Sequence, residues 1–253
     1  MSRSQLSTAA KAQLEQIERA VTNYAELGDG QSFQQFRAIG FYDPESSQWT
    51  IPRNRQPMTL LNAQQLALIE TLLLQVDAAG VRGHLVEAGI WRGGAVAFMR
   101  ALLQAYEMPE RSVIAADSFA GIPLSEYFRH DQVNKWRDRW EAGLEEVTAG
   151  LTRLGVLDDR LELLPGLFAD TLPTLADREL ALIRLDADSF DSTTTALECL
   201  YPLLNRHGAV IIDDWHLIGC RIAVDTYRRK NKLAGEVQVT ADNAWWIKQE
   251  ERG

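Results

Sequence analysis

The stretch HLVEAGIWRGGA, residues 84–95, determines how the chain folds, because a short apolar run ends there in an acidic residue and a glycine. Such a run, followed at once by glycines and a new apolar period, is typical of a buried strand that passes into a helix. Gly89 can adopt the tight turn at this junction and leaves room for a ligand beside the backbone. Gly93 and Gly94 open a helix predicted at 94–106, whose free N–H groups favour a carboxylate or a phosphate.

The same pattern of strand and helix repeats along the rest of the chain. Four further apolar runs predict strands: SVIAADS (112–118), RLELLPG (160–166), LALIRLD (180–186) and AVIIDD (209–214). Helices are predicted around 94–106, 131–154, 193–204 and 219–231. VQVT (237–240) and WWIKQE (245–250), with Asp242-Asn243 as the turn, predict a final antiparallel hairpin. The chain is therefore expected to be an α/β protein with a doubly wound, mainly parallel sheet of seven strands.

The first part of the chain departs from this alternation. Apolar residues at helical spacing predict an opening helix from about Ser4 to Glu26. The polar stretch between Gly28 and Pro57 has scattered aromatic residues and no period, which is typical of a lid or a binding loop. A second helix is predicted at 60–78. We therefore divide the chain into an N-terminal helix and lid segment, residues 1–58, and an α/β domain, residues 59–253.

Composition excludes several classes of protein. The net charge of −9 argues against a nucleic-acid surface, which should show a basic face. The chain has neither a membrane-spanning apolar run nor the apolar core of a secretory signal at its start. Cys199 and Cys220 lack the spacing of a zinc site or redox pair and are expected to be free thiols. We expect a soluble, cytoplasmic protein with no nucleic-acid or membrane partner.

The glycine loop also indicates the kind of ligand. Its spacing, E-x-G-x-x-x-G-G from Glu87, departs from the G-x-G-x-x-G of dinucleotide-binding proteins. An acidic residue before the first glycine suits a ligand with an ammonium group, such as S-adenosylmethionine. Asp117 ends the second strand, where a carboxylate can accept hydrogen bonds from ribose hydroxyls. The alternative is that the glycines serve only as tight turns and that Asp117 caps a helix.

Two later strands end in paired carboxylates, Asp186 with Asp188 and Asp213 with Asp214. The segment between them is long enough for one crossover helix, so the two strands are expected to be neighbours. Clustered carboxylates repel each other unless a cation neutralises them, and Mg²⁺ prefers such oxygen ligands. The alternative is a set of solvated helix caps, because Asp is common where strands end.

A metal at this position can lower the pKa of a substrate hydroxyl while a nearby carboxylate takes its proton. Asp186, Asp213 and Asp214 are the candidate ligands, and Asp188 is the candidate base. Spacing alone also allows Asp186 and Asp188 to exchange these roles. His216, two residues after Asp214, is a second catalytic candidate.

The segment 121–140 has two interpretations. It either forms a lid over the acceptor or, with Trp136 and Trp140, belongs to a helix at 131–154 packed on the body. His130 is a further candidate on this lid, and Arg92 is interpreted as a surface charge.

Several motifs, in order, resemble the TylF/macrocin O-methyltransferase family, whose members methylate deoxysugar hydroxyls on macrolide and aminocoumarin antibiotics. They are VEAGIWRGGA, ADSFAG, LGVLDDRLELLPGLFADTLP, LDADSF and IIDDW, and the resemblance runs from about Leu60 to the end of the chain. It implies a Rossmann-like class I methyltransferase fold, often in a homo-oligomer, that uses S-adenosylmethionine and Mg²⁺.

The resemblance also implies residue roles. The methionine and ribose parts of the cofactor would lie against Glu87, Gly89, Gly93, Gly94, Asp117 and Ser118. The adenine would lie beside Gly166, Leu167 and Phe168. Asp186, Asp213 and Asp214 would hold Mg²⁺, and Asp188 would be the general base.

Two departures from the family pattern concern the acceptor pocket. Ala187 replaces a common glycine, and Trp215-His216 follow the paired aspartates where the family often has Tyr. The expected function is Mg²⁺-dependent O-methylation of a (deoxy)sugar hydroxyl on a small natural product, in antibiotic biosynthesis. The alternatives are a catechol-type acceptor, a nicotinamide-dependent oxidoreductase, and a non-catalytic protein that keeps the cofactor pocket.

Overall fold

A computed structural model of the chain describes residues 2–22, 42–43, 48–49, 53, 56–128, 131–135, 140–240 and 243–249. Its larger sheet has seven strands: β3 (His84–Ala88), β4 (Val113–Asp117), β5 (Leu161–Pro165), β6 (Leu180–Leu185), β7 (Leu204–Ile212), β8 (Gln238–Val239) and β9 (Ala244–Ile247). Two further short strands, β1 (Tyr42–Asp43) and β2 (Gln48–Trp49), pair with each other.

The strand order of the larger sheet is β5-β4-β3-β6-β7-β9-β8. The first five strands are parallel, and β9 and β8 are antiparallel additions at the end. This confirms the predicted fold, including the final hairpin, although Asp242 of its predicted turn lies outside the described residues. The chain leaves β3 toward β4 and returns beside it as β6, so the order reverses between β3 and β6. Ligands of open α/β sheets bind beyond the strand ends at such a switch point.

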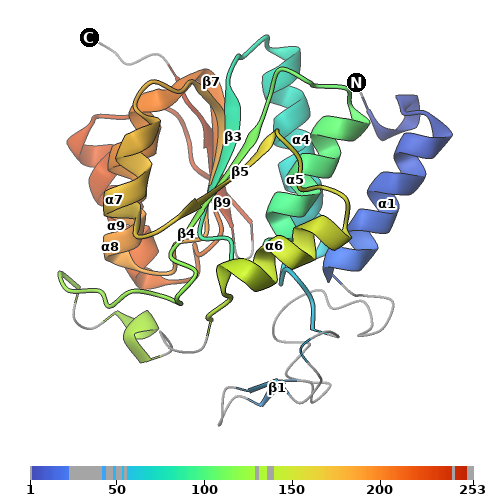
Figure 1. Ribbon diagram of the computed structural model, residues 1–253. Coiled ribbons are helices and arrows are strands. Elements are labelled where there is room, and N and C mark those ends of the chain that lie inside the picture. Colours follow the sequence, from blue (N-terminus) through green and yellow to red (C-terminus); the bar gives the residue numbers. More distant parts are fainter. Residues whose placement is uncertain are drawn as a thin grey trace.

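Helices cover both faces of the sheet (Figure 1). On one face lie α1 (Thr8–Thr22), α4 (Ala63–Ala78), α5 (Gly94–Ala105) and α6 (Leu144–Arg153). On the other lie α7 (Phe168–Thr171), α8 (Phe190–Leu200) and α9 (Ile218–Lys230), with short 3-10 turns at Leu172–Leu175 and Tyr201–Leu203. Strand residues alternate between the two cores: Leu85 packs with the first group and Val86 with the second. None of the described helices is long and apolar enough to cross a membrane.

The N-terminal helix is part of the same body as the sheet. Leu14, Ile17 and Val21 of α1 are buried in the core that includes α5. The carbonyl of Val21 accepts hydrogen bonds from Met58 N (2.7 Å) and Thr59 N (3.1 Å), so the chain before α4 is fastened to the end of α1. The division at residues 58 and 59 lies within this segment and remains a prediction. Most of the predicted lid lies outside the described part, because residues 23–41, 44–47, 50–52 and 54–55 are not described.

One predicted helix was wrong. Residues 131–154 do not form one helix: Gln132–Lys135 make a 3-10 turn, residues 140–143 are not helical, and α6 begins at Leu144. Gly143 stands at its N-cap with extended backbone, which interrupts the charged periodicity. The helix predicted at 193–204 instead begins at Phe190, because the Ser189 side chain caps it by accepting from Ser192 N.

Candidate active site

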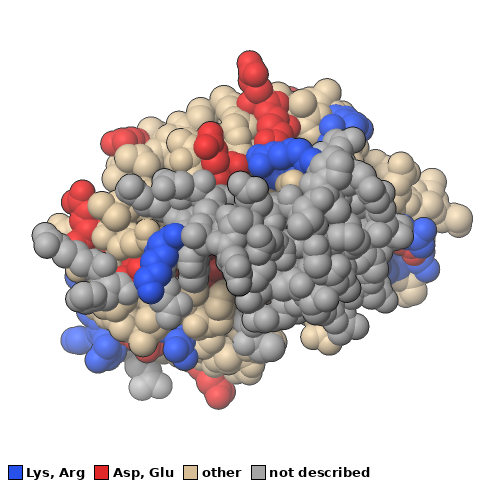
Figure 2. Space-filling model, turned by 90° about the horizontal axis from the view of Figure 1, so that it is seen from below, with Lys and Arg blue, Asp and Glu red and all other residues tan. Residues whose placement is uncertain are grey.

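A cavity of about 1140 Å³ lies at the ends of the parallel strands, on the switch point between β3 and β6. Figure 2 looks onto this end of the molecule, where acidic and basic side chains are interspersed on the part drawn in colour. The cavity brings together most of the predicted site residues: Glu87, Gly89, Asp117, Ser118, Gly166, Leu167, Phe168, Asp186, Asp188, Asp213, Asp214 and His216.

Gly89 lets the end of β3 approach the end of β6. Its φ is 89°, and a Cβ on it would overlap the carbonyl oxygen of Asp186. Asp117 holds the turn that follows, because its Oδ2 accepts from Ile90 N (2.7 Å) and Trp91 N (3.1 Å). Its Oδ1 accepts from Phe119 N (2.8 Å). Asp117 therefore organises the glycine loop, and as a carboxylate on the cavity wall it can still accept from a ligand.

Gly93 and Gly94 do not line the cavity, although Ala95 does. The N–H of Gly94 donates to the Met58 carbonyl at 3.0 Å, and a Cβ on Gly94 would lie 2.6 Å from that oxygen. Gly94 is thus required for close packing of the chain before α4. The expectation that the N–H of Gly94 is free to bind an anion was wrong, because this N–H donates a hydrogen bond to the Met58 carbonyl.

Arg92 is buried, at 7% exposed, and not the surface charge that its sequence context suggested. Its guanidinium donates to the carbonyls of Pro57 (2.8 Å) and Arg53 (2.9 Å) and pairs with Glu146 at 3.0 Å. Arg92 therefore fastens Arg53 and Pro57 to the glycine loop and to α6.

Glu87 and Arg184 form a buried ion pair beneath the cavity. They stand side by side because β3 and β6 are neighbours and Glu87 and Arg184 are register partners. Burial raises the pKa of Glu87 to about 8, although Arg184 opposes this shift. The second carboxylate oxygen, Oε2, is buried with no hydrogen-bond partner among the described residues. A ligand ammonium in the cavity would fit this acceptor.

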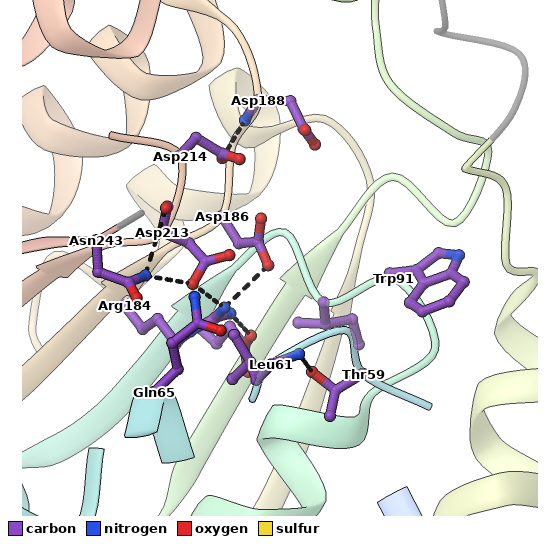
Figure 3. A network of polar contacts seen from close by, with 12 residues as sticks. Thr59, Leu61, Gln65, Trp91, Arg184, Asp186, Asp188, Asp213, Asp214 and Asn243 are labelled. Atoms are coloured by element: carbon purple, nitrogen blue, oxygen red, sulfur yellow. Dashed lines mark hydrogen bonds and ion pairs between the residues drawn. The ribbon is translucent and has the colours of Figure 1, made fainter. Parts of the chain in front are cut away.

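The acidic cluster consists of Asp186, Asp188, Asp213 and Asp214 (Figure 3). One oxygen from each of Asp186, Asp188 and Asp214 lies within 4.8 Å of the others. The fourth member, Asp213, directs Oδ1 to Arg184 Nη2 and to Asn243 Nδ2, both at 2.7 Å. Both contacts use Oδ1, so Oδ2 can serve another partner. The predicted carboxylates are therefore gathered at the ends of two neighbouring strands.

Asp188 is held in an uncommon backbone conformation. Its φ is 59°, in the left-handed region that few residues other than Gly and Asn adopt readily. Its N–H donates to Asp214 Oδ2 at 2.9 Å, which joins the turn after β6 to the turn after β7. The backbone thus aims the Asp188 side chain into the cavity, which it lines.

Burial and mutual repulsion raise the pKa values of three members of the acidic cluster, Asp186, Asp188 and Asp214. Burial, followed by the charge of Asp213, raises the pKa of Asp186 well above its usual value. Burial and the charges of Asp214 and Asp186 do the same for the pKa of Asp188. The pKa of Asp214 is raised to about 7 by burial and by Asp213. Arg184 is the only lysine or arginine among the described residues that line the cavity, so negative charge is in excess. A hard cation with oxygen ligands, such as Mg²⁺, fits this donor set.

The raised pKa values predict that the metal-free protein loses stability as pH rises. Between the unfolded and folded pKa values, the folded protein binds more protons than the unfolded chain, so the free energy of unfolding falls through that window. The window runs from 3.8 to about 7 for Asp214 and from 4.5 to about 8 for Glu87. In a chelator, Tm should be lower at pH 8.5 than at pH 6, by about 2–4 °C for each kcal/mol.

Asp186→Asn is the control, because an amide does not titrate and the fall in Tm with pH should be shallower in this variant. Added Mg²⁺ should raise Tm more at pH 8.5 than at pH 6, since it competes with protons for the carboxylates. Equal pH dependence in the wild type and the variant would contradict the assignment of the raised pKa values.

Aromatic and apolar side chains form the other walls of the cavity. Trp91, with φ 47°, meets Trp140 edge to face with ring centroids 5.6 Å apart. Leu167 is 49% exposed at the mouth and precedes Phe168, which begins α7. Trp140 thus belongs to the cavity wall and not to a helix, whereas Trp136 and His130 lie outside the described residues. His216 also lines the cavity, and its catalytic role stays a prediction.

Sequence reasoning missed three polar residues in and around the site: Arg184 and Asn243, which contact Asp213, and Asp131, which contacts the start of α8. Arg184 had a visible signal, because it is the one charged residue inside the apolar run LALIRL, and buried charges are usually paired. Asn243 and Asp131 had none, since their partners come from distant parts of the chain.

Comparisons with known proteins identify relatives over most of the chain. Residues 13–248 match the family model of macrocin O-methyltransferases (TylF). The 8-demethyl-8-(2,3-dimethoxy-alpha-L-rhamnosyl)-tetracenomycin-C 4'-O-methyltransferase of Streptomyces olivaceus is 40% identical over 194 residues, 74% of this chain and 74% of that protein. The mycinamicin III 3''-O-methyltransferase of Micromonospora griseorubida is 34% identical over 197 residues, 74% of this chain and 77% of that protein. The structure of the O-methyltransferase NovP superposes with a TM-score of 0.81 and 31% identity, over 95% of this chain and 100% of that one.

Proposed function

Because the chain belongs to the macrocin O-methyltransferase (TylF) family and is therefore an O-methyltransferase, we propose that it methylates a (deoxy)sugar hydroxyl on a natural product, using S-adenosylmethionine and Mg²⁺. The observation that carries the proposal is the acidic cluster beside the glycine loop, in one cavity of a chain from this family. An excess of carboxylates suits a cation-assisted reaction, and the orphan oxygen of Glu87 suits the ammonium of the methyl donor.

The names of two relatives support a sugar as the acceptor. One relative is named for methylation at the 4' position of a rhamnosyl tetracenomycin, and the other for 3'' methylation of mycinamicin III. The two methylated positions differ, so these names support a sugar as the class of acceptor but do not indicate which hydroxyl is methylated. Leu167 and the Trp91–Trp140 pair give the cavity apolar walls, which suit the aglycone of such a molecule.

We place the methyl donor along the ends of β3, β4 and β5. Glu87 and Gly89 would contact its methionine part, and Asp117 and Ser118 its ribose. Gly166, Leu167 and Phe168 would flank its adenine. Gly93 and Gly94 would shape the loop from behind and not touch the donor, since neither lines the cavity.

We assign Asp186, Asp213 and Asp214 as ligands of the cation and Asp188 as the general base. Mg²⁺, when bound, would lower the pKa of the acceptor hydroxyl, while S-adenosylmethionine would supply the methyl group. Asp188 accepts the hydroxyl proton as the new O–C bond forms and the S–C bond breaks. Asp188 suits this role because its carboxylate lines the cavity beside the proposed cation ligands Asp186 and Asp214. Asp214 keeps the base in place by accepting its backbone N–H.

Two further assignments complete the proposal. The protein is expected to act in the cytoplasm as a homo-oligomer, and light scattering in solution measures the oligomeric state.

Glu87→Gln should weaken binding of S-adenosylhomocysteine, the demethylated product, by about 10–100-fold, because a charge-assisted hydrogen bond to the ammonium is lost. Calorimetric titration measures the change. Glu70→Gln is the matched control: Glu70 is also a buried glutamate paired with an arginine, Arg3, but it does not line the cavity. Affinity unchanged in Glu87→Gln, or equally reduced in the control, would contradict this placement of the donor.

A further inference from the structure

Asp131 is a buried carboxylate that the proposed reaction does not use. It is 3% exposed and precedes the 3-10 turn Gln132–Lys135 in the segment after β4. This segment passes beneath the lower ends of α8 and α9 in Figure 1. A buried carboxylate needs partners that offset the loss of water, so its contacts indicate what keeps it in place.

The partners of Asp131 are the first turns of two helices. Its Oδ2 accepts from the N–H of Phe190, the first residue of α8, at 2.8 Å. The same oxygen lies against Gly219, in the first turn of α9, so closely that a Cβ there would collide with the carboxylate. Helix N-termini offer unpaired N–H groups and partial positive charge, which stabilise a buried anion.

These two helices follow directly from the two acidic turns. Phe190 is two residues after Asp188, and Gly219 is five residues after Asp214. The hydrogen bond from Asp188 N to Asp214 Oδ2 joins the same two turns on the cavity side. Asp131 joins the starts of the two helices a second time, although it does not itself line the cavity.

The segment that carries Asp131 is itself well fastened. Asn134 exchanges hydrogen bonds with the backbone of Ser125, at 2.9 and 3.3 Å. Asp191 Oδ2 accepts from the N–H groups of Glu126 (2.5 Å) and Tyr127 (3.0 Å). The phenyl rings of Phe128 and Phe190 lie 5.9 Å apart. Asp131 therefore lies in a segment whose neighbouring residues are fixed by hydrogen bonds to the rest of the fold.

We propose that Asp131 is a positioning residue that sets the distance between the turns carrying Asp186–Asp188 and Asp213–Asp214, and so tunes the cation site. This inference rests on the proposed function, which places the cation on those turns. Partners one step removed from metal ligands typically change affinity by about 10–100-fold.

The test is calorimetric titration of Mg²⁺ into the full chain. Asp131→Ala should weaken Mg²⁺ binding by about 10–100-fold, whereas S-adenosylhomocysteine binding should stay at the wild-type level and so report a folded protein. Asp131→Asn keeps an acceptor for Phe190 N and should recover most of the lost affinity. Glu70→Ala is the matched control, because Glu70 is also a buried carboxylate but does not line the cavity, and it should leave Mg²⁺ affinity nearly unchanged.

Gly219→Ala tests the contact from the other side. Alanine is intrinsically better than glycine in a helix, so the variant should fold, but its Cβ should displace the Asp131 carboxylate. It should weaken Mg²⁺ binding in the wild-type background and add no further loss to Asp131→Ala.

Wild-type Mg²⁺ affinity in Asp131→Ala, or an equal loss in Glu70→Ala, would overturn the positioning role while leaving the proposed function intact. A wild-type protein that binds no Mg²⁺ would overturn the proposed metal site and this inference together.

Discussion

Asp214→Asn should lower the affinity for Mg²⁺ by at least about 100-fold, because loss of a direct ligand should cost more than loss of the outer partners that change affinity 10–100-fold. Asp214 is the member of the acidic cluster that lies deepest, at 5% exposed, and its oxygens reach both Asp186 and Asp188. The amide keeps an oxygen for the N–H of Asp188, so the turn after β6 should stay folded. Methyl transfer at limiting Mg²⁺ should fall with the affinity.

Calorimetric titration of Mg²⁺ measures the first effect, and methyl transfer from labelled S-adenosylmethionine measures the second. Asp77→Asn is the control, because Asp77 is an aspartate that pairs with Arg111 and does not line the cavity. Mg²⁺ affinity that is unchanged in Asp214→Asn would remove the acidic cluster from the reaction.

Asp188→Asn should lower kcat by about 10²–10⁴-fold, the usual contribution of a general base. Asparagine tolerates the left-handed backbone at this position, so the effect can be read as loss of the base and not of the turn. Affinities for Mg²⁺ and for S-adenosylhomocysteine should change little. In the wild type, kcat should fall as pH drops below the pKa of the base, because protonated Asp188 cannot accept a proton. This acid limb should disappear in the variant.

The same variant separates the two role assignments that remain open. If Asp188→Asn loses Mg²⁺ binding and Asp186→Asn keeps it, the two residues exchange roles, as the grouping of Asp186, Asp188 and Asp214 oxygens within 4.8 Å would allow. If kcat in Asp188→Asn stays within a few-fold of the wild type, neither assignment of Asp188 holds.

Much of the fold was predictable because each parallel strand is a short apolar run that stops at a polar residue. The ends of β6 and β7 follow from this pattern, and with them the gathering of Asp186 and Asp213 on neighbouring strands. The crossover between them is one helix long, so adjacency could be inferred from length. The spacing of the glycines after β3 likewise predicted a ligand site at the end of this strand, where the cavity lies.

The remaining features depend on contacts between distant segments. Local periodicity favoured a helix at 131–154, but the segment around Asp131 is held by Phe190 and other partners across the fold. The neighbours of Arg92 in sequence favoured a surface charge, but Arg92 is buried and donates to the carbonyls of Arg53 and Pro57. The position of Gly94 favoured an anion-binding turn, but its N–H donates a hydrogen bond to the carbonyl of Met58. In each case the partner is more than 30 residues away in the sequence, so a local sequence pattern could not predict the contact.

The most direct test of the proposed reaction is methyl transfer by chelator-treated protein, using S-adenosylmethionine labelled in its methyl group, before and after Mg²⁺ is added. The acceptors should be a panel of rhamnosylated natural products, beginning with the tetracenomycin for which the Streptomyces olivaceus relative is named, together with simple catechols. We predict label on a sugar hydroxyl only after Mg²⁺ is added. Transfer at the same rate in the chelator, or label on the catechols and not on the sugars, would contradict the proposed reaction.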